Sequence, residues 1–180
     1  MNRLLTIVSL LLLGLWLGGA IFFGAAVAPS LFAVLRDAGL GNPNELAGSI
    51  VTRLLRIINR SGFEISLFII VTRFFTKRDE RFGWRLAEMI SLAIVAIMTA
   101  VSQWVISPKM LALRGAMSAP IDQVPHDDVR RVAFDSLHRY SVYVMGIALV
   151  AAFVSFVMIS MASTRRPGAS EDSMRRSDLS

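Results

Sequence analysis

Residues 4–28 read LLTIVSLLLLGLWLGGAIFFGAAVA, a run without a charged side chain. Two further uncharged runs follow, at residues 89–106 and 140–164. A helix needs roughly 20 apolar residues to cross about 30 Å of hydrocarbon, and a run of about 18 or more indicates a candidate span. Three such runs in a chain of 180 residues leave too little polar sequence to enclose them in a soluble fold. The sequence therefore predicts an integral membrane protein.

A fourth span is predicted between the first two runs, although it is charged. Residues 54–75 are long enough, but they include Arg56, Arg60, Glu64 and Arg73. Charged side chains are costly at the centre of a span, so they must lie near its ends or pair. A re-entrant hairpin or a surface helix is the alternative. We predict an all-α polytopic transmembrane four-helix bundle, with spans at about residues 4–28, 54–75, 86–106 and 139–162.

The sequence predicts one membrane domain, residues 1–163, and a polar tail, residues 164–180, that we expect to be disordered. We expect Pro29 to disturb the end of the first span and Ser107-Pro108 to end the third. Asp127 or Asp128 should cap the last helix, whose amphipathic start runs straight into the final span. No internal repeat is visible, and the first span is too long for a cleaved signal peptide.

The chain has a net charge of +6, but its basic residues flank the apolar runs. Cations in these places meet anionic lipid headgroups, so we predict a lipid bilayer as partner and no nucleic acid. The short turn at residues 77–85 is dense in basic residues, which favours cytoplasmic termini in the plasma (bacterial inner) membrane. The absence of cysteine excludes disulfides and thiolate metal sites.

Small residues recur at four-residue steps in the first span. Gly14 and Gly18 form a GxxxG pattern, and Ala20, Gly24 and Ala28 are a second set of small residues at four-residue steps. Such residues let two helices approach closely. We expect them to pack against the other spans of the same chain, and dimerisation is the alternative.

Polar side chains should gather near one membrane face. Up-and-down connectivity places the start of span two, the end of span three and the start of span four at the same face. Arg53, Arg56, Arg60 and Glu64 also follow one stripe of helix two, which we expect to face the bundle interior. We predict a buried or semi-buried cluster in which Glu64 pairs with Arg60 and Arg139, and which includes Asn59, Gln103, Asp135, His138 and Ser141. Glu88 should lie near the other face, with Arg81 and Arg85.

Two interpretations of this cluster are open. Glu64 and His138 could form a site for a proton, an ion or a ligand, because histidine changes charge near neutral pH. Alternatively, the charges neutralise one another and fix the helix register. Since His126 and His138 are the only imidazoles and no catalytic motif is present, we predict no enzyme, no metal site and no cofactor.

Two sequence blocks carry a family resemblance over residues 4–162. They are ISPKMLALR at residues 106–114 and FDSLHRYSV at residues 134–142. With them the chain resembles the transmembrane protein 205-like family, a domain of unknown function, and more distantly the membrane part of copper resistance protein D. The resemblance implies four spans and no established activity. Its motif positions here are Pro108, Arg114, Phe134, Leu137, His138 and Ser141.

These observations together predict a non-enzymatic membrane protein. We expect it to act through helix packing with a membrane-protein partner or as a small homo-oligomer. The alternative is a component that transports an ion, a proton or a small solute through the Glu64/His138 cluster.

Overall fold

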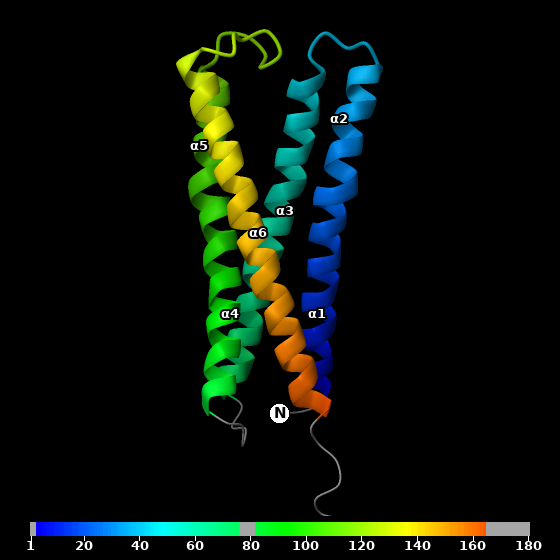
Figure 1. Ribbon diagram of the computed structural model, residues 1–180, viewed down its shortest axis with the longest axis vertical. Helices are drawn as coiled ribbons and strands as arrows, with labels where there is room; N and C mark the ends of the chain where they lie inside the picture. Colours follow the sequence, from blue (N-terminus) through cyan, green and yellow to red (C-terminus); the bar gives the residue numbers. More distant parts are fainter. Residues whose placement is uncertain (1–2, 76–81, 165–180) are drawn as a thin grey trace, which may run out of the picture.

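The computed structural model describes residues 3–75 and 82–164, and the described part is all-helical. Its elements are α1 (Arg3–Phe22), the π-helical turn η1 (Phe23–Val27), α2 (Ala28–Asp37), α3 (Pro43–Phe75), α4 (Phe82–Val101), the π-helical turn η2 (Ser102–Ile106), α5 (Ser107–Ala116) and α6 (Val129–Thr164). Because α1, η1 and α2 are continuous, as are α4, η2 and α5, the chain forms four long antiparallel rods (Figure 1). The four-helix prediction is confirmed, and the predicted tail beyond residue 164 lies outside the described residues.

Pro108 does not end its helix, so that expectation is wrong, and at Pro29 the expected disturbance is a π-helical turn in a helix that continues. Each proline follows a π-helical turn, and the helix continues for a further ten-residue segment, α2 or α5. In η2 the backbone N–H of Ser107 donates to the carbonyl of Ser102, five residues earlier. A proline lacks the N–H that an α-helix needs at that place. The wider turn shifts the hydrogen-bond pattern just before the proline, and the rod continues.

The last helix starts as predicted. Asp128 Oδ1 accepts from the backbone N–H groups of Arg130 at 2.8 Å and Arg131 at 3.3 Å, which makes Asp128 the N-cap. The helix then runs without a break to Thr164.

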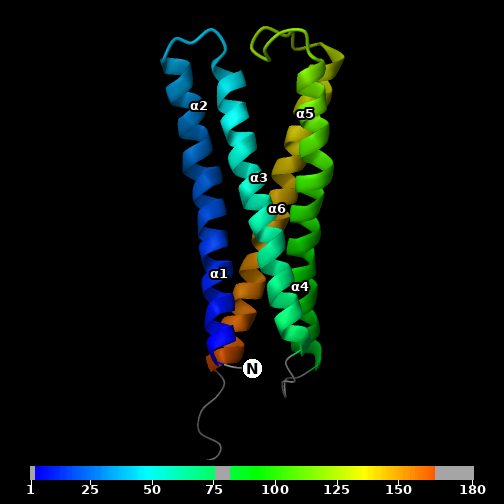
Figure 2. The same ribbon diagram turned by 180° about the vertical axis from the view of Figure 1, so that it is seen from behind.

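Three of the four rods are long and apolar enough to cross a membrane: Arg3–Asp37, Gly83–Ala116 and Val129–Ala162. Large apolar side chains cover their outer faces, as expected for contact with lipid, for example Leu15 and Val150. The fourth rod, α3, is less apolar but runs alongside the others for the length of the bundle (Figures 1 and 2). In this arrangement α3 is neither a hairpin nor a helix lying across the others.

The structure contains an internal repeat, contrary to the sequence analysis. The first rod and the third consist of the same three elements with the same lengths: an α-helix of 20 residues, a π-helical turn of 5 and an α-helix of 10. Counterparts begin 79 residues apart: Arg3 and Phe82, Phe23 and Ser102, Ala28 and Ser107. Each rod is followed by a returning helix, α3 from Pro43 or α6 from Val129, 86 residues apart.

The pattern of burial supports this equivalence. In α1 the buried positions include Ser9, Leu13, Trp16 and Ala20, and their counterparts in α4 are the buried Glu88, Leu92, Val95 and Thr99. In α3 they include Gly62, Ser66, Ile69 and Arg73, and their counterparts in α6 are the buried Ala148, Ala152, Ser155 and Ile159. The bundle is therefore two equivalent helical hairpins around an axis parallel to the helices.

The packed core occupies the half of the bundle that holds α1, α4 and the end of α6. It is built around Leu13, Trp16, Ile69, Leu92 and Val95. Beyond the π-helical turns, α2 packs on α3 and α5 packs on α6, and these two pairs diverge toward the loop end (Figure 2). This divergence leaves room for a site between the two hairpins.

Candidate functional site

A cavity of about 250 Å³ lies where the two helix pairs diverge. All four elements of the loop end contribute to its lining, and its walls are both polar and apolar. The lining residues are Phe32 from α2; Asn44, Gly48, Val51, Thr52 and Leu55 from α3; Ser107, Met110, Leu111 and Arg114 from α5; Ile121 from the loop; and Arg131, Phe134, Asp135, His138 and Ser141 from α6.

Arg114 is the most constrained charged side chain of the cavity. Its guanidinium carbon lies 5.5 Å from the centre of the Phe134 ring. On its other side, a Cβ built on Gly48 would come within 2.4 Å of Arg114 Nη2, so the guanidinium in this position lies directly against the Gly48 backbone. Arg114 Nε lies 3.2 Å from Glu45 Oε1, and the two side chains are 14% and 22% exposed. Arg114 therefore bridges α5, α3 and α6.

The connection from residue 117 to 128 closes the loop end of the cavity. It is longer than the equivalent connection, residues 38–42, and it is fastened from both hairpins. The backbone N–H of Ile121 donates to Glu45 Oε2 at 3.2 Å, and the carbonyl of Ile121 accepts from Arg131 Nη1 at 2.8 Å. Glu45 and Arg131 are counterparts in the repeat. We call residues 117–128 the cover loop.

The cover loop also caps α3. Asp122 Oδ1 accepts from the backbone N–H of Asn44 at 3.2 Å and from its side-chain amide at 2.6 Å. Asp122 Oδ2 accepts from the backbone N–H of Glu45 at 3.0 Å. These amides in the first turn of a helix have no partner within it. Asp122 thus does for α3 what an N-cap residue does, but from a distant part of the chain.

The cavity lies across the axis that relates the two hairpins. Four pairs of counterpart positions both line it: Phe32 and Leu111, Gly48 and Phe134, Thr52 and His138, Leu55 and Ser141. Arg114 lies between one of these pairs, Gly48 and Phe134. A site at the interface of two repeats is the arrangement found in many transporters that are built from repeated halves.

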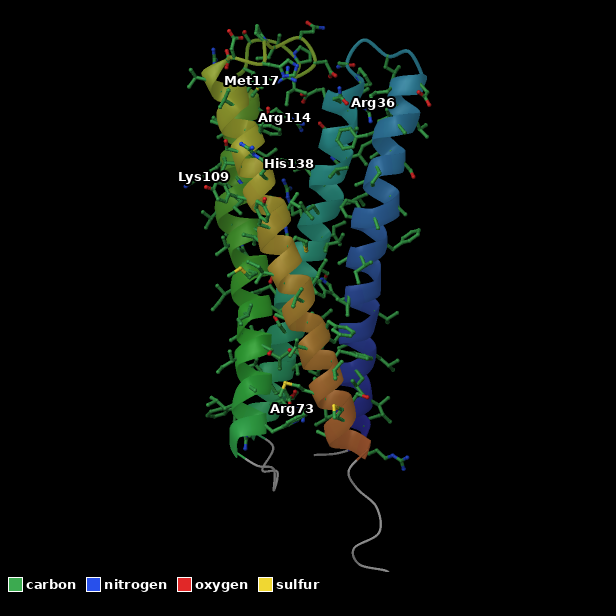
Figure 3. All side chains as sticks on the ribbon, viewed as in Figure 1. Arg36, Arg73, Lys109, Arg114, Met117 and His138 are labelled. Carbon is green, nitrogen blue, oxygen red and sulfur yellow. The ribbon has the colours of Figure 1, made fainter. Side chains whose placement is uncertain are left out.

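The structure divides the predicted polar cluster. Asp135, His138 and Ser141 line the cavity, and Arg114 and His138 lie toward the loop end (Figure 3). Glu64 pairs with Arg60, as predicted, at 2.9 Å. The two side chains are 58% and 71% exposed, so the prediction that they are buried is wrong. Arg139 contacts Ser136, with Nη2 3.5 Å from its hydroxyl.

Depth in the bundle explains this separation. The starts of α3 and α6 and the end of α5 do lie at the same end, as predicted (Figure 1). Glu64, however, lies about two-thirds of the way along α3, whereas His138 lies a quarter of the way along α6. At 1.5 Å per residue this separates them by roughly 18 Å along the axis. They do not form one site.

Asn59 and Ser102 form a buried contact below the cavity, one turn beyond the lining residues Leu55 and Ser107. Asn59 Nδ2 donates to Ser102 Oγ at 2.8 Å. The sequence analysis predicted that Asn59 and the end of span three lie at the same depth in the bundle. Among the described residues, Asn59 Oδ1 and the Oε1 atom of the half-buried Gln103 have no hydrogen-bond partner.

Sequence reasoning missed the buried ion pair at the other end of the bundle. Glu88 was expected at the interface with Arg85 and Arg81, and residue 81 lies outside the described residues. Glu88 Oε1 instead lies 2.8 Å from Arg73 Nε, with side chains 2% and 6% exposed. Arg85 Nη2 donates to the carbonyl of Arg73 at 3.0 Å. Glu45 and Asp122 were also missed, because their partners are far away in the sequence.

The three glycines predicted to pack behave differently. A Cβ on Gly14 would come within 3.2 Å of Phe156, so Gly14 is at a close helix contact. A Cβ on Gly18 or Gly24 would meet nothing within 4 Å. The close approach of α1 to α3 is instead at Gly62, where a Cβ would come within 2.6 Å of the Trp16 ring.

The cavity presents side chains that can bind a ligand. Arg114 supplies a planar guanidinium, His138 and Ser141 supply polar atoms, and Val51, Leu55 and Met110 supply apolar surface. Within residues 3–75 and 82–164, no three side chains of His, Asp or Glu are grouped so that they could hold a metal ion.

A comparison with protein families matches residues 11–119 to a model described as a domain of unknown function, DUF4149. The matched range covers more than half of the 180 residues and includes Glu45 and Arg114, whereas α6 follows it. Comparisons with curated proteins and with solved structures give no match. The chain, a membrane-type bundle of helices, therefore belongs to the DUF4149 family.

Proposed function

We propose that the protein is a non-enzymatic membrane protein that binds a small organic anion in the cavity between its two hairpins. The observation that carries this proposal is the position of Arg114, held between Gly48 and Phe134 on the axis of the repeat. A guanidinium binds carboxylate and phosphate groups in bidentate geometry. The Phe134 ring contacts the guanidinium without adding a charge, and Glu45 is its carboxylate partner.

Glu45 supports the choice of an anion. Its Oε1 atom lies 3.2 Å from Arg114 Nε, so a carboxylate already fits beside the guanidinium at this position. An external anion would compete with Glu45 for this position. Because Glu45 also accepts from Ile121 of the cover loop, such an exchange would loosen the loop at the cavity's entrance.

The size and lining of the cavity limit the ligand further. Pockets for drug-sized ligands are typically about 300–1,000 Å³, so a cavity of about 250 Å³ suits a smaller molecule. Phe32, Leu55 and Met110 offer apolar contact to the body of a ligand, and Arg114 offers a cation to its anionic group. A short aromatic or aliphatic acid combines the two features.

Both sequence blocks that resemble the transmembrane protein 205-like family reach the cavity. The first contributes Ser107, Met110, Leu111 and Arg114, and the second Phe134, Asp135, His138 and Ser141. We propose that both blocks serve to build this cavity. We also propose that the resemblance to this family, and the more distant one to the membrane part of copper resistance protein D, is a resemblance of their membrane helix bundles.

The proposal can be tested with three probes of equal size: benzoate, benzylammonium and benzyl alcohol. Saturation-transfer NMR on the full chain in nanodiscs would measure their binding. We expect benzoate to bind in preference to both others, and this preference to disappear in Arg114→Gln. Equal binding of benzyl alcohol, or binding of benzoate to Arg114→Gln at the parent level, would contradict the proposal.

Transport is the related alternative, for an ion, a proton or a small solute. Its support here is the cavity between two repeated halves, with His138 and Ser141 in the wall, rather than a Glu64/His138 cluster. Benzoate flux into proteoliposomes would distinguish transport from binding alone.

Association with a membrane-protein partner or with further copies is the second candidate. It is favoured by the open space around Gly18 and Gly24 and by the charged outer face of α3. For the location we propose the plasma (bacterial inner) membrane with cytoplasmic termini, on the basis of the basic residues 77–85.

A further inference from the structure

The outer face of α3 carries an exposed ion pair. Arg60 Nε lies 2.9 Å from Glu64 Oε1, and the two side chains remain 71% and 58% exposed. Arg53 and Arg56 are exposed as well and precede this pair at helical spacing. The buried side of α3, with Asn59, Gly62 and Ser66, is the opposite one.

The pair lies at the level of the membrane interior. Trp16, at the middle of the uncharged run 4–28, donates from Nε1 to the carbonyl of Ile58 at 2.8 Å. Its ring also lies against Gly62. Arg60 and Glu64 are each two residues from Gly62, or about 3 Å along the helix. Charged side chains at this depth are rare, and they face protein or a water-filled cavity rather than lipid.

The other hairpin shows what a lipid-facing surface looks like at the same place. The counterparts of Arg60 and Glu64 in α6 are Gly146 and Val150, both exposed and uncharged. The outer face of α3 is therefore charged, whereas the equivalent outer face of α6, in the other hairpin, is uncharged. Some other protein surface must cover the charged one.

We infer that a second copy of this chain covers it, through a symmetric contact of α3 with α3. Exposed side chains continue the face at steps of three and four residues, as in a coiled-coil seam: Arg56, Arg60, Glu64, Leu67, Val71 and Phe74. In a two-fold dimer with its axis along the membrane normal, residues of equal depth meet. Arg60 of one copy then lies one helical turn from Glu64 of the other.

Charge complementarity identifies the partner as a second copy. At the level of Gly62 the face carries one base and one acid, Arg60 and Glu64, with Arg56 one turn nearer the loop end, so a second copy brings an opposite charge to each member of the pair. The ion pair within each chain becomes a network of four side chains that is shielded from lipid. This association is independent of the cavity, which lies at the loop end on the bundle axis.

Cysteine cross-linking tests the contact, because the chain has no cysteine of its own. Leu67→Cys places a thiol on the α3 face, and Phe153→Cys places one at the counterpart position of α6, which is 58% exposed. After mild oxidation in native membranes we expect a disulfide dimer for Leu67→Cys alone. Equal cross-linking at both positions, no dimer at position 67, or an adduct with a different protein would each overturn the inference.

Charge complementation gives a second, independent test. Arg60→Glu alone and Glu64→Arg alone should each leave the chain monomeric, because all four side chains of the network then carry the same charge. When the two variants are co-expressed with different tags, we expect them to co-purify as a heterodimer in mild detergent. Self-association of either single variant at the parent level, or failure of the two to pair although each unfolds at the parent temperature, would contradict the inference.

Discussion

Arg73 Nε and Glu88 Oε1 lie 2.8 Å apart between α3 and α4, with side chains only 6% and 2% exposed. This pair joins the end of the first hairpin to the start of the second. Their counterparts in the repeat, Ile159 and Ser9, are uncharged. The ion pair therefore occurs at one of two equivalent helix contacts.

Removing one partner of this pair should be more harmful than removing both. Glu88→Leu removes a carboxylate partner of the buried Arg73 guanidinium, and we expect it to destabilise the protein by about 3–5 kcal/mol. Glu88→Leu together with Arg73→Met should recover most of that loss. Thermal unfolding in detergent measures the difference, and a double variant as unstable as the single one would contradict this interpretation.

Gly62 should not tolerate even a small side chain. Gly62→Ala places a Cβ within 2.6 Å of the Trp16 ring, so α1 and α3 must separate or the indole must lose its hydrogen bond to Ile58. The matched control is Gly18→Ala, where nothing lies within 4 Å. We expect a lower unfolding temperature for the first and an equal or higher one for the second, because alanine favours a helix by roughly 0.5–1 kcal/mol over glycine. The opposite order would contradict the packing described.

Asp122 should hold both α3 and the cover loop. Asp122→Ala removes the acceptor for the backbone N–H groups of Asn44 and Glu45, and losing a capping residue costs about 1 kcal/mol. Hydrogen exchange of these two amides should become faster, whereas the exposed neighbour substitution Asp127→Ala should leave it unchanged. Unaltered exchange in Asp122→Ala would argue against the cap.

Glu45 should compete with the ligand for Arg114. In Glu45→Gln the guanidinium is free of its carboxylate, so benzoate should bind about fivefold more tightly, a change that corresponds to about 1 kcal/mol for the competing ion pair. Titration of benzoate into both proteins measures the change. Weaker binding in Glu45→Gln would show that Glu45 supports the site rather than competing for it.

Arg36 provides the control for Arg114. It lies on α2, is exposed, and donates from Nε to the carbonyl of Phe32. It is not part of the contact between the Arg114 guanidinium and the Phe134 ring. Arg36→Gln should therefore bind benzoate like the parent, while Arg114→Gln should not. Equal losses in both variants would indicate a general charge effect at this membrane face.

The class of the fold was predictable because uncharged runs of spanning length are rare in soluble proteins. The amphipathic start of the last helix and its cap at Asp128 also followed from local sequence. The continuation past Pro29 and Pro108 did not, since a π-helical turn before proline leaves no composition signal. The internal repeat was hidden because counterparts such as Ser9 and Glu88 share a buried position but not a chemistry.

The site was predicted only in part. Periodicity placed Arg60 and Glu64 on one stripe of α3, but it could not say whether that stripe faces the bundle or away from it. The connectivity of the spans placed His138 and Ser141 in the predicted cluster, and the two sequence blocks added Arg114. Glu45, Asp122 and the Arg73–Glu88 pair depend on contacts between distant segments, which no local pattern reports.

The four-span bundle requires α3 to cross the membrane. Only then do the two connections, residues 38–42 and 117–128, lie at the same membrane face, where the cavity forms between the two hairpins. Single cysteines at the exposed positions Gly41, Gln123 and Gly83, labelled with a membrane-impermeant maleimide in intact cells and in inverted vesicles, test this directly. We predict that positions 41 and 123 react from the same side and position 83 from the other. Reaction of positions 41 and 123 from opposite sides would contradict the four-span bundle and the cavity with it.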